Sequence, residues 1–123
     1  MMKYLSILFL LAMLPLQSQA ADSNGHFAIW GKGNKSCHSY NISRGTEEEQ
    51  GYKDYIMGYL TAFNVQLPDT YRVSGEMNLN DILAWLDDYC GLKPILAFEQ
   101  SLADFIKDNY DKRMKKSPSK YRR

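Results

Sequence analysis

Cys37 and Cys90 are the two cysteines of this 123-residue chain, and their chemistry is the easiest to anticipate. Two cysteines allow a single intramolecular pair. In an exported protein they would lie in an oxidising compartment, which favours a disulfide. Closing a loop of roughly fifty residues stabilises a small domain by about 4 kcal/mol on the chain-entropy model. We expect a Cys37–Cys90 disulfide.

A catalytic thiol is the alternative interpretation of Cys37, because His38 follows it directly. Adjacent side chains in a chain rarely face each other, and a lone exported thiol tends to be oxidised. A zinc site would need a pair such as C-x-x-C or H-x-x-x-H. The two histidines, His26 and His38, and the two separated cysteines form no such pair. We therefore expect no metal site.

Three aspartates could suggest calcium binding or acid–base chemistry: Asp81, Asp87 and Asp88. Their spacing is not that of an EF-hand, and it fits the solvent-facing side of a helix. The chain has no G-x-S-x-G, phosphate-loop or dinucleotide-binding glycine pattern, and its serines have no identifiable base partner. We predict no catalytic residue, no cofactor and no enzymatic activity.

The first twenty residues have the pattern of a secretory signal peptide. Met1-Met2-Lys3 supplies a positive start, Tyr4 to Leu16 is apolar, and Ser18-Gln19-Ala20 offers small residues for cleavage near Ala20. The apolar run is shorter than the roughly 20 residues of a membrane-spanning helix. We expect a signal peptide at 1–20 and a periplasmic or secreted mature protein with no integral membrane span.

Charge divides the rest of the chain into an acidic domain at 21–111 and a basic tail at 112–123. All fourteen acidic residues and seven basic residues lie in the domain, so its net charge is −7. The tail could attract anionic lipid, nucleic acid or an acidic protein, fold back on the domain, or stay solvated; among these we do not expect nucleic acid. The seven tail bases are Lys112, Arg113, Lys115, Lys116, Lys120, Arg122 and Arg123.

Composition and periodicity predict a helical globular domain. Hydrophobic residues make up 45% and charged residues 24% of the chain, which excludes a disordered or low-complexity protein. The run Phe27–Trp30 lies between glycines and predicts an extended edge or a strap over the core. Ser36 to Ile42 is expected to form a short helix or turn.

The strongest helical pattern begins at Thr46-Glu47-Glu48-Glu49, which has the form of a capping box. We expect a helix from there to about Asn64, with Gly51 and Gly58 allowing another element to come close. One face of this helix is apolar and aromatic, and it predicts either core or a partner-binding groove or dimer surface. Its members are Tyr52, Tyr55, Ile56, Tyr59 and Phe63.

Two more helices follow a connection at 65–77. Asn78 is expected to cap the first of them and Gly91 to end it in a left-handed conformation, while Pro94 suits the first turn of the next. The fold class is therefore all-α, a small bundle of three main helices plus a short N-terminal helix or turn, held by one disulfide. The apolar faces are Leu79, Ile82, Leu83, Leu86 and Cys90 in one helix, and Ile95, Phe98, Leu102, Phe105 and Ile106 in the next.

Several of these features together resemble a known family. They are a cysteine near the start of the domain, the Gly-Tyr-Leu-Thr-Ala-Phe-Asn segment at 58–64, the Ile-Leu-Ala-Trp-Leu-Asp-Asp-Tyr-Cys segment at 82–90, and Lys93-Pro94. Over about Cys37 to Tyr110 the chain is similar to small exported bacterial proteins of the HdeA type, which are periplasmic acid-stress chaperones. The W-L-D-x-Y-C segment looks more like their uncharacterised relatives.

The resemblance implies an all-helical, disulfide-bonded periplasmic domain, often a homodimer at neutral pH, whose acid-exposed form binds unfolding client proteins. Similar helical domains bracketed by cysteines occur among immunity proteins that block bacterial toxins. The alternative function is therefore an immunity protein or envelope inhibitor that binds one protein partner at neutral pH.

Overall fold

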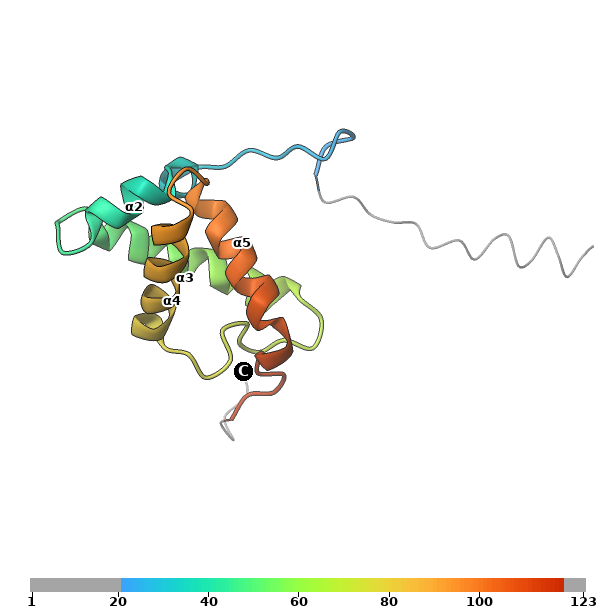
Figure 1. Ribbon diagram of the computed structural model, residues 1–123. Coiled ribbons are helices and arrows are strands. Elements are labelled where there is room, and N and C mark those ends of the chain that lie inside the picture. The colour runs from blue at the N-terminus through green and yellow to red at the C-terminus, as the bar shows by residue number, and fades with distance from the viewer. Residues whose placement is uncertain (1–20, 119–123) are drawn as a thin grey trace, which may run out of the picture.

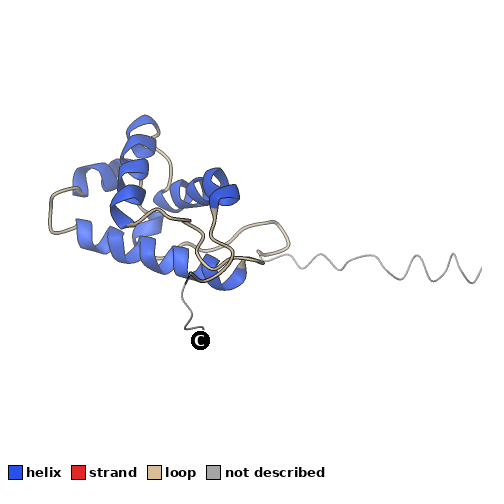
Figure 2. Ribbon diagram, turned by 90° about the horizontal axis from the view of Figure 1, so that it is seen from below, coloured by secondary structure: helices blue, strands red, loops and turns tan. Residues whose placement is uncertain are grey.

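The computed structural model describes residues 21–118, and these form an all-helical bundle (Figures 1 and 2). The expected signal peptide at 1–20 lies outside the described residues. The order of elements is η1 Gly31–Asn34, α2 Cys37–Ser43, α3 Glu49–Gln66, α4 Leu79–Leu92, α5 Phe98–Asn109 and η2 Tyr110–Lys112. The expected all-α class, with a short N-terminal helix before three longer ones, is confirmed.

Helix α2 is tied to the segment between α4 and α5. Ser36 caps it by accepting a hydrogen bond from the backbone N–H of Ser39 at 3.1 Å. Its first two N–H groups, on Cys37 and His38, donate to carbonyls of that segment. The expected disulfide from Cys37 to Cys90 is present and joins α2 to α4.

Helix α3 begins at Glu49, three residues later than the capping-box pattern predicted. The hydroxyl of Thr46 donates to the carbonyl of Ser43 at 2.7 Å and accepts from the N–H of Glu48 at 3.2 Å, so it closes a turn. The side chain of Glu49 accepts from the N–H of Gly45 at 3.2 Å. The predicted capping box was therefore wrong, because both of its side chains stabilise the α2–α3 loop.

Two glycines of this helix were expected to allow another element to come close, and only one of them does. A Cβ atom on Gly51 would lie 2.8 Å from the side chain of Lys32, so η1 does approach there. A Cβ atom on Gly58 would meet nothing within 4 Å, and the expectation for this position was wrong. The helix also continues to Gln66, which places Val65 on it in an exposed position.

Helix α4 has the capping box that α3 lacks. Asn78 accepts a hydrogen bond from the N–H of Asp81 at 3.0 Å, and Asp81 accepts from the N–H of Asn78 at 2.9 Å. The predicted cap is confirmed. The predicted left-handed end at Gly91 was wrong, because the helix continues to Leu92 and ends at Lys93 in a conformation with negative φ.

Helix α5 begins at Phe98, and Pro94 does not start it. Backbone carbonyls of Pro94 and Leu96 accept hydrogen bonds from the start of α2, while the N–H of Phe98 donates to the carbonyl of Lys35 at 2.7 Å. These bonds fasten the turn at residues 94–97 to residues 35–38. Ile95 is consequently 91% exposed, so the prediction that it lies on the buried face was wrong.

The core is built around three aromatic rings from three helices. Tyr40 of α2 stacks on Phe98 of α5 at 4.9 Å between centroids, and Tyr52 of α3 meets both edge-on. The buried face of α4 packs against them, and Val73 from the α3–α4 connection closes the core. None of the helices within residues 21–118 is long and apolar enough to cross a membrane.

Replacing Cys37 and Cys90 by serine should lower the free energy of unfolding by about 4 kcal/mol, because the bond closes a loop with a sequence separation of 53. Thermal unfolding of the chain from Ala21, with and without a reducing agent, measures this. Reduction of the unmodified protein should lower its melting temperature and leave that of the double variant unchanged. An unmodified protein whose melting temperature ignores reduction would contradict the disulfide.

Candidate functional site

The aromatic face expected on α3 divides into a buried part and a half-exposed part. Tyr52 and Ile56 are 2% and 0% exposed and belong to the core. Tyr55, Tyr59 and Phe63 follow one another at intervals of four residues and are only partly buried. Their rings form a row, with centroids 6.0 Å and then 5.0 Å apart.

The segment Phe27–Trp30 lies opposite this row and forms the second wall of a groove of about 600 Å³. Ile29 is partly buried and the other three residues are exposed, so the segment lines the groove and does not cover the core; we call it the strap. Gly33, three residues further along in η1, lies against α3, since a Cβ atom there would fall 2.0 Å from the hydroxyl oxygen of Tyr55. Trp30 and Phe27 are 83% and 64% exposed. We call this feature the aromatic groove; it is lined by Ala21, Phe27, Ala28, Ile29, Trp30, Tyr55, Tyr59, Phe63, Gln66 and Glu99.

One carboxylate, Glu99 of α5, lies in the aromatic groove. The hydroxyl of Tyr59 donates a hydrogen bond to its Oε1 at 2.8 Å, which joins α3 to α5. Burial, and then this bond, raises the pKa of Tyr59 well above that of an ordinary tyrosine. Burial is also the main cause that raises the pKa of Tyr55. The groove is therefore an apolar surface that contains one carboxylate, which the hydrogen bond from Tyr59 holds in place.

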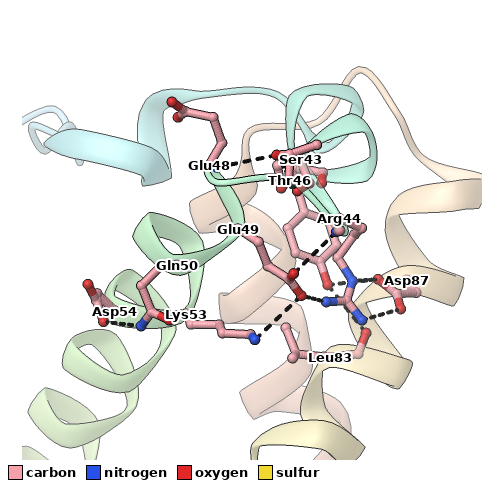
Figure 3. A network of polar contacts seen from close by, with 12 residues as sticks. Ser43, Arg44, Thr46, Glu48, Glu49, Gln50, Lys53, Asp54, Leu83 and Asp87 are labelled. Atoms are coloured by element: carbon pink, nitrogen blue, oxygen red, sulfur yellow. Dashed lines mark hydrogen bonds and ion pairs between the residues drawn. The ribbon is translucent and has the colours of Figure 1, made fainter.

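A second cluster, the polar clamp, consists of Tyr40, Arg44, Glu49 and Asp87 and joins three helices (Figure 3). Arg44, just after α2, donates through Nε and Nη2 to the carboxylate of Asp87 on α4 at 2.9 and 3.2 Å. Its Nη1 pairs with Glu49 at the start of α3. The hydroxyl of Tyr40 donates to the same Asp87 at 2.8 Å. Asp87 was expected to face solvent without a partner, but its carboxylate accepts hydrogen bonds from both Tyr40 and Arg44.

The contacts of the polar clamp keep Arg44 positively charged and Tyr40 protonated, because they raise the pKa of both. The hydrogen bond to Asp87 is the main cause that raises the pKa of Arg44. Burial, and then the bond to Asp87, raises the pKa of Tyr40. Lys53 joins the edge of the cluster through a longer contact with Glu49 at 3.5 Å. A guanidinium bound to two carboxylates is a strong, oriented link.

A third tyrosine repeats this pattern between α4 and α5. The hydroxyl of Tyr89 donates to the carboxylate of Asp104, and its ring stacks on that of Trp85 at 4.9 Å between centroids. Burial, and then the bond to Asp104, raises the pKa of Tyr89 to about 12. Tyr40, Tyr59 and Tyr89 thus each join two helices through a carboxylate.

The polar groups of these clusters bind one another and hold the helices together. Within residues 21–118, each buried side-chain nitrogen or oxygen has a hydrogen-bond partner, and no group of three His, Cys, Asp or Glu side chains is placed to hold a metal ion. His26 and His38 are both exposed. The aromatic groove, by contrast, presents aromatic rings on the surface of the described residues.

The described part of the basic tail begins on the domain surface. Lys112 ends η2, and the guanidinium of Arg113 lies over the ring of Tyr110 at 3.9 Å from its centroid. Lys115 and Lys116 are exposed. The other three tail bases, Lys120, Arg122 and Arg123, lie outside the described residues.

Sequence reasoning missed Arg44, Glu49 and Glu99 as site residues. Arg44 and Asp87 are 43 positions apart, and no local spacing signals such a pair. Glu99 resembles an ordinary acid in the first turn of a helix. Its near-complete burial at 9% exposure follows only from how α3 crosses α5. The one signal in the sequence was that Glu99, a charged residue, lies within the apolar face of a helix.

No family model, curated protein or solved structure matches this chain.

The polar clamp predicts unequal effects of two substitutions around Glu49. Replacing Arg44 by glutamine removes three charge-assisted hydrogen bonds and should lower the free energy of unfolding by about 1–2 kcal/mol, a value reduced because the site is partly exposed. Replacing Lys53 by glutamine removes only the outer contact and should cost less than about 0.5 kcal/mol. Urea unfolding of both variants tests this, and equal effects would contradict the clamp.

The tyrosine–carboxylate bonds predict sensitivity to alkali. The pKa of Tyr89 is about 12 in the folded protein, and those of Tyr40 and Tyr59 are also raised, whereas unfolded tyrosines ionise near pH 10. Their stabilising contribution is therefore complete below about pH 10 and lost as the pH rises towards 12. The urea midpoint should fall over that range, and less steeply in a Tyr89→Phe variant. A midpoint independent of pH up to 12 would be the contrary result.

Proposed function

We propose that this chain is an exported, non-enzymatic binding protein of the bacterial periplasm that holds unfolding proteins through apolar surface at low pH, an acid-stress chaperone. The observation that carries the proposal is the aromatic groove. Its half-exposed row of rings on α3 and its exposed strap residues, Phe27 and Trp30, offer contiguous apolar area of the kind that marks protein-binding surfaces.

Acid would enlarge this surface because carboxylates hold the helices together. Asp87, Glu99 and Asp104 each accept a bond from a tyrosine of another helix. Carboxylates as a class become neutral below about pH 3, and a neutral acid accepts a weaker hydrogen bond. The links from α2 to α4, from α3 to α5 and from α4 to α5 would therefore weaken together.

The pair of Lys32 with Glu48 adds a fourth link of this kind, between η1 and the start of α3. The bond to Lys32 is the main cause that lowers the pKa of Glu48. A carboxylate with a lowered pKa contributes stability above its unfolded pKa and loses it as the pH falls through its folded one. This contact is thus kept at neutral pH and lost in acid, where α3 would move more easily.

Net charge acts in the same direction. From Ala21 onwards the fourteen acids balance fourteen Lys and Arg at neutral pH, and in strong acid those bases plus two histidines give about +16. Self-repulsion would then expand the chain, while the Cys37–Cys90 bond would keep it from unfolding completely. The resemblance of residues 37–110 to HdeA-type proteins supports the same assignment, and the pattern of residues 1–20 supports export.

A second candidate is an immunity protein or envelope inhibitor that binds one partner at neutral pH. One observation favours it: the aromatic groove is already open, with Trp30 83% exposed, in the folded state. A binding site that needs no unfolding suits a specific partner. The acidic domain would then help to attract a basic protein.

The deciding experiment titrates the chain from Ala21 between pH 7 and pH 2. It follows tertiary structure, oligomeric mass and the solubility of an acid-labile client protein. Loss of native packing together with client protection is the expected result, because the carboxylate links and the charge balance fail over this range. A rigid fold at pH 2, or expansion without protection, would favour the neutral-pH partner.

Paired variants locate the binding surface in that experiment. Replacing Phe27 and Trp30 by serine should remove most of the client protection at little cost in stability, because both side chains are exposed in the folded protein. Leu92→Ser is the matched control, since Leu92 is 85% exposed and lies outside the groove. Equal protection by the strap and control variants would exclude the groove as the client site.

A further inference from the structure

A carboxylate that no described base neutralises lies in the aromatic groove. Glu99 is only 9% exposed, and within residues 21–118 no lysine, arginine or histidine forms an ion pair with it. The side chains that line the groove include no base either. A carboxylate removed from water is costly unless hydrogen-bond donors or a cation compensate for it. Glu99 therefore favours a positively charged occupant of the groove.

One oxygen of this carboxylate can be reached from the groove. Oε1 of Glu99 accepts the hydrogen bond from Tyr59, whereas Oε2 accepts none from residues 21–118. Every buried side-chain oxygen of these residues does have a hydrogen-bond partner, so Oε2 is not fully buried. Because Glu99 lines the groove, an occupant of the groove can donate a hydrogen bond to this oxygen.

The polar clamp shows which group completes a carboxylate of this kind in the same protein. Asp87 accepts a hydrogen bond from Tyr40 at 2.8 Å and two more from the guanidinium of Arg44 at 2.9 and 3.2 Å. Glu99 has the matching bond from Tyr59 at 2.8 Å but receives no guanidinium from the described part of the chain. The planar, two-donor guanidinium fits a carboxylate better than other cations do. An arginine of a partner would therefore give Glu99 the contacts that Arg44 gives Asp87.

The rings beside Glu99 suit the same group. A guanidinium is attracted to the face of an aromatic ring, and in this protein Arg113 lies over the ring of Tyr110 at 3.9 Å from its centroid. Burial, and then the negative charge of Glu99, raises the pKa of Tyr55, so the carboxylate acts on this ring as well as on that of Tyr59. An arginine beside Glu99 would meet rings and carboxylate together.

The shape of the groove suits a stretch of polypeptide chain. Phe63 lies eight positions after Tyr55 on α3, so the row of rings is about 12 Å long at a rise of about 1.5 Å per residue. An extended peptide covers that length with about four residues. The opposite wall presents the exposed rings of Phe27 and Trp30. Residues on either side of the arginine would therefore pack between two aromatic walls.

We propose that the aromatic groove binds an extended segment of a partner protein in which an arginine is flanked by apolar residues, with its guanidinium on Glu99 and its neighbours on the rings. This inference rests on the proposed role of the groove as a protein-binding surface, and it names the segment taken at neutral pH, where carboxylates are ionised. The net charge of −7 on residues 21–111 attracts such a segment.

The test compares two peptides at pH 7. One is acetyl-Ser-Leu-Arg-Phe-Ser-amide, and the other has citrulline, which resembles arginine in shape and has no charge, in place of the arginine. NMR titration of residues 21–123 gives both dissociation constants. The arginine peptide should bind about tenfold more tightly, a ratio that corresponds to about 1.4 kcal/mol and suits a hydrogen bond between charged groups. Equal affinity for the two peptides, or no binding of either, would overturn the proposal.

Two matched variants assign this preference to Glu99. Glu99→Gln keeps the size of the side chain and an oxygen for Tyr59 but removes the charge. It should bring the ratio of the two affinities close to one and leave the citrulline peptide bound as before, which also shows that the variant is folded. Asp88→Asn is the control, since Asp88 is exposed, carries the same charge and lies outside the groove, and it should keep the preference. A preference that survives in Glu99→Gln would contradict the assignment and overturn the proposal.

A further variant tests the groove without changing a buried residue. Trp30→Ser should weaken the binding of both peptides, because Trp30 is 83% exposed and belongs to one wall of the groove. Unchanged affinity would place the peptides elsewhere and overturn the proposal. Binding of tetramethylammonium as tight as that of the arginine peptide would overturn it in favour of a small organic cation. A dimer of the chain that Trp30→Ser dissociates and neither peptide displaces would overturn it in favour of a second copy.

The specificity for arginine and the acid-stress function fail separately. Protection of a client protein in acid, without a preference for the arginine peptide at pH 7, would leave the chaperone function standing and overturn the specificity. A preference for the arginine peptide without client protection would overturn the acid-stress function and support a specific partner at neutral pH.

Discussion

The covalent bond between Cys37 and Cys90 sets the geometry on which the rest of the structure depends. It fixes α2 to α4, and the backbone bonds from Cys37 and His38 then hold residues 94–97 in a turn that lasts until α5 begins at Phe98. Tyr40, one turn along α2, consequently enters the core between Tyr52 and Phe98 with its hydroxyl on Asp87. Core and polar clamp share this one side chain.

Two kinds of interaction hold the helices together, and they respond differently to pH. Aromatic and aliphatic contacts among Tyr40, Tyr52, Phe98 and the buried face of α4 involve no proton transfer near neutral pH. The contacts at Asp87, Glu99 and Asp104 are instead hydrogen bonds that tyrosine hydroxyls donate to carboxylates. These hydrogen bonds need the tyrosine proton, and the raised pKa values of Tyr40, Tyr59 and Tyr89 mean that their contribution to stability is lost only in alkali. The apolar centre contains no carboxylate and, apart from its tyrosines, no titratable side chain.

Local sequence patterns predicted the helices well. They failed at residues whose hydrogen-bond partners belong to another element of the fold. Asn78 was correctly identified as a cap because its partner Asp81 is three residues away. Thr46 and Pro94 were misread because their local environment belongs to other elements: Thr46 closes the turn after α2, and the carbonyl of Pro94 receives the N–H of His38. The aromatic face of α3 was visible as a periodicity. Its division into core and groove depends on where the strap and Glu99 lie, which no spacing reveals.

The attachments of α3 fix the position of its outer rings. Its N-terminal end is held through Glu49 to Arg44 and its middle through Tyr59 to Glu99, and both links use carboxylates. Its C-terminal end is held differently, because the side chain of Asn64 accepts the N–H of Val73 at 2.6 Å and cannot be protonated at moderate acidity. Helix α3 is therefore held at three points along its length, whereas α2 is bonded covalently to α4. Tyr55 and Tyr59 lie between the first and the last of these attachments, which keeps their rings in place as one wall of the aromatic groove.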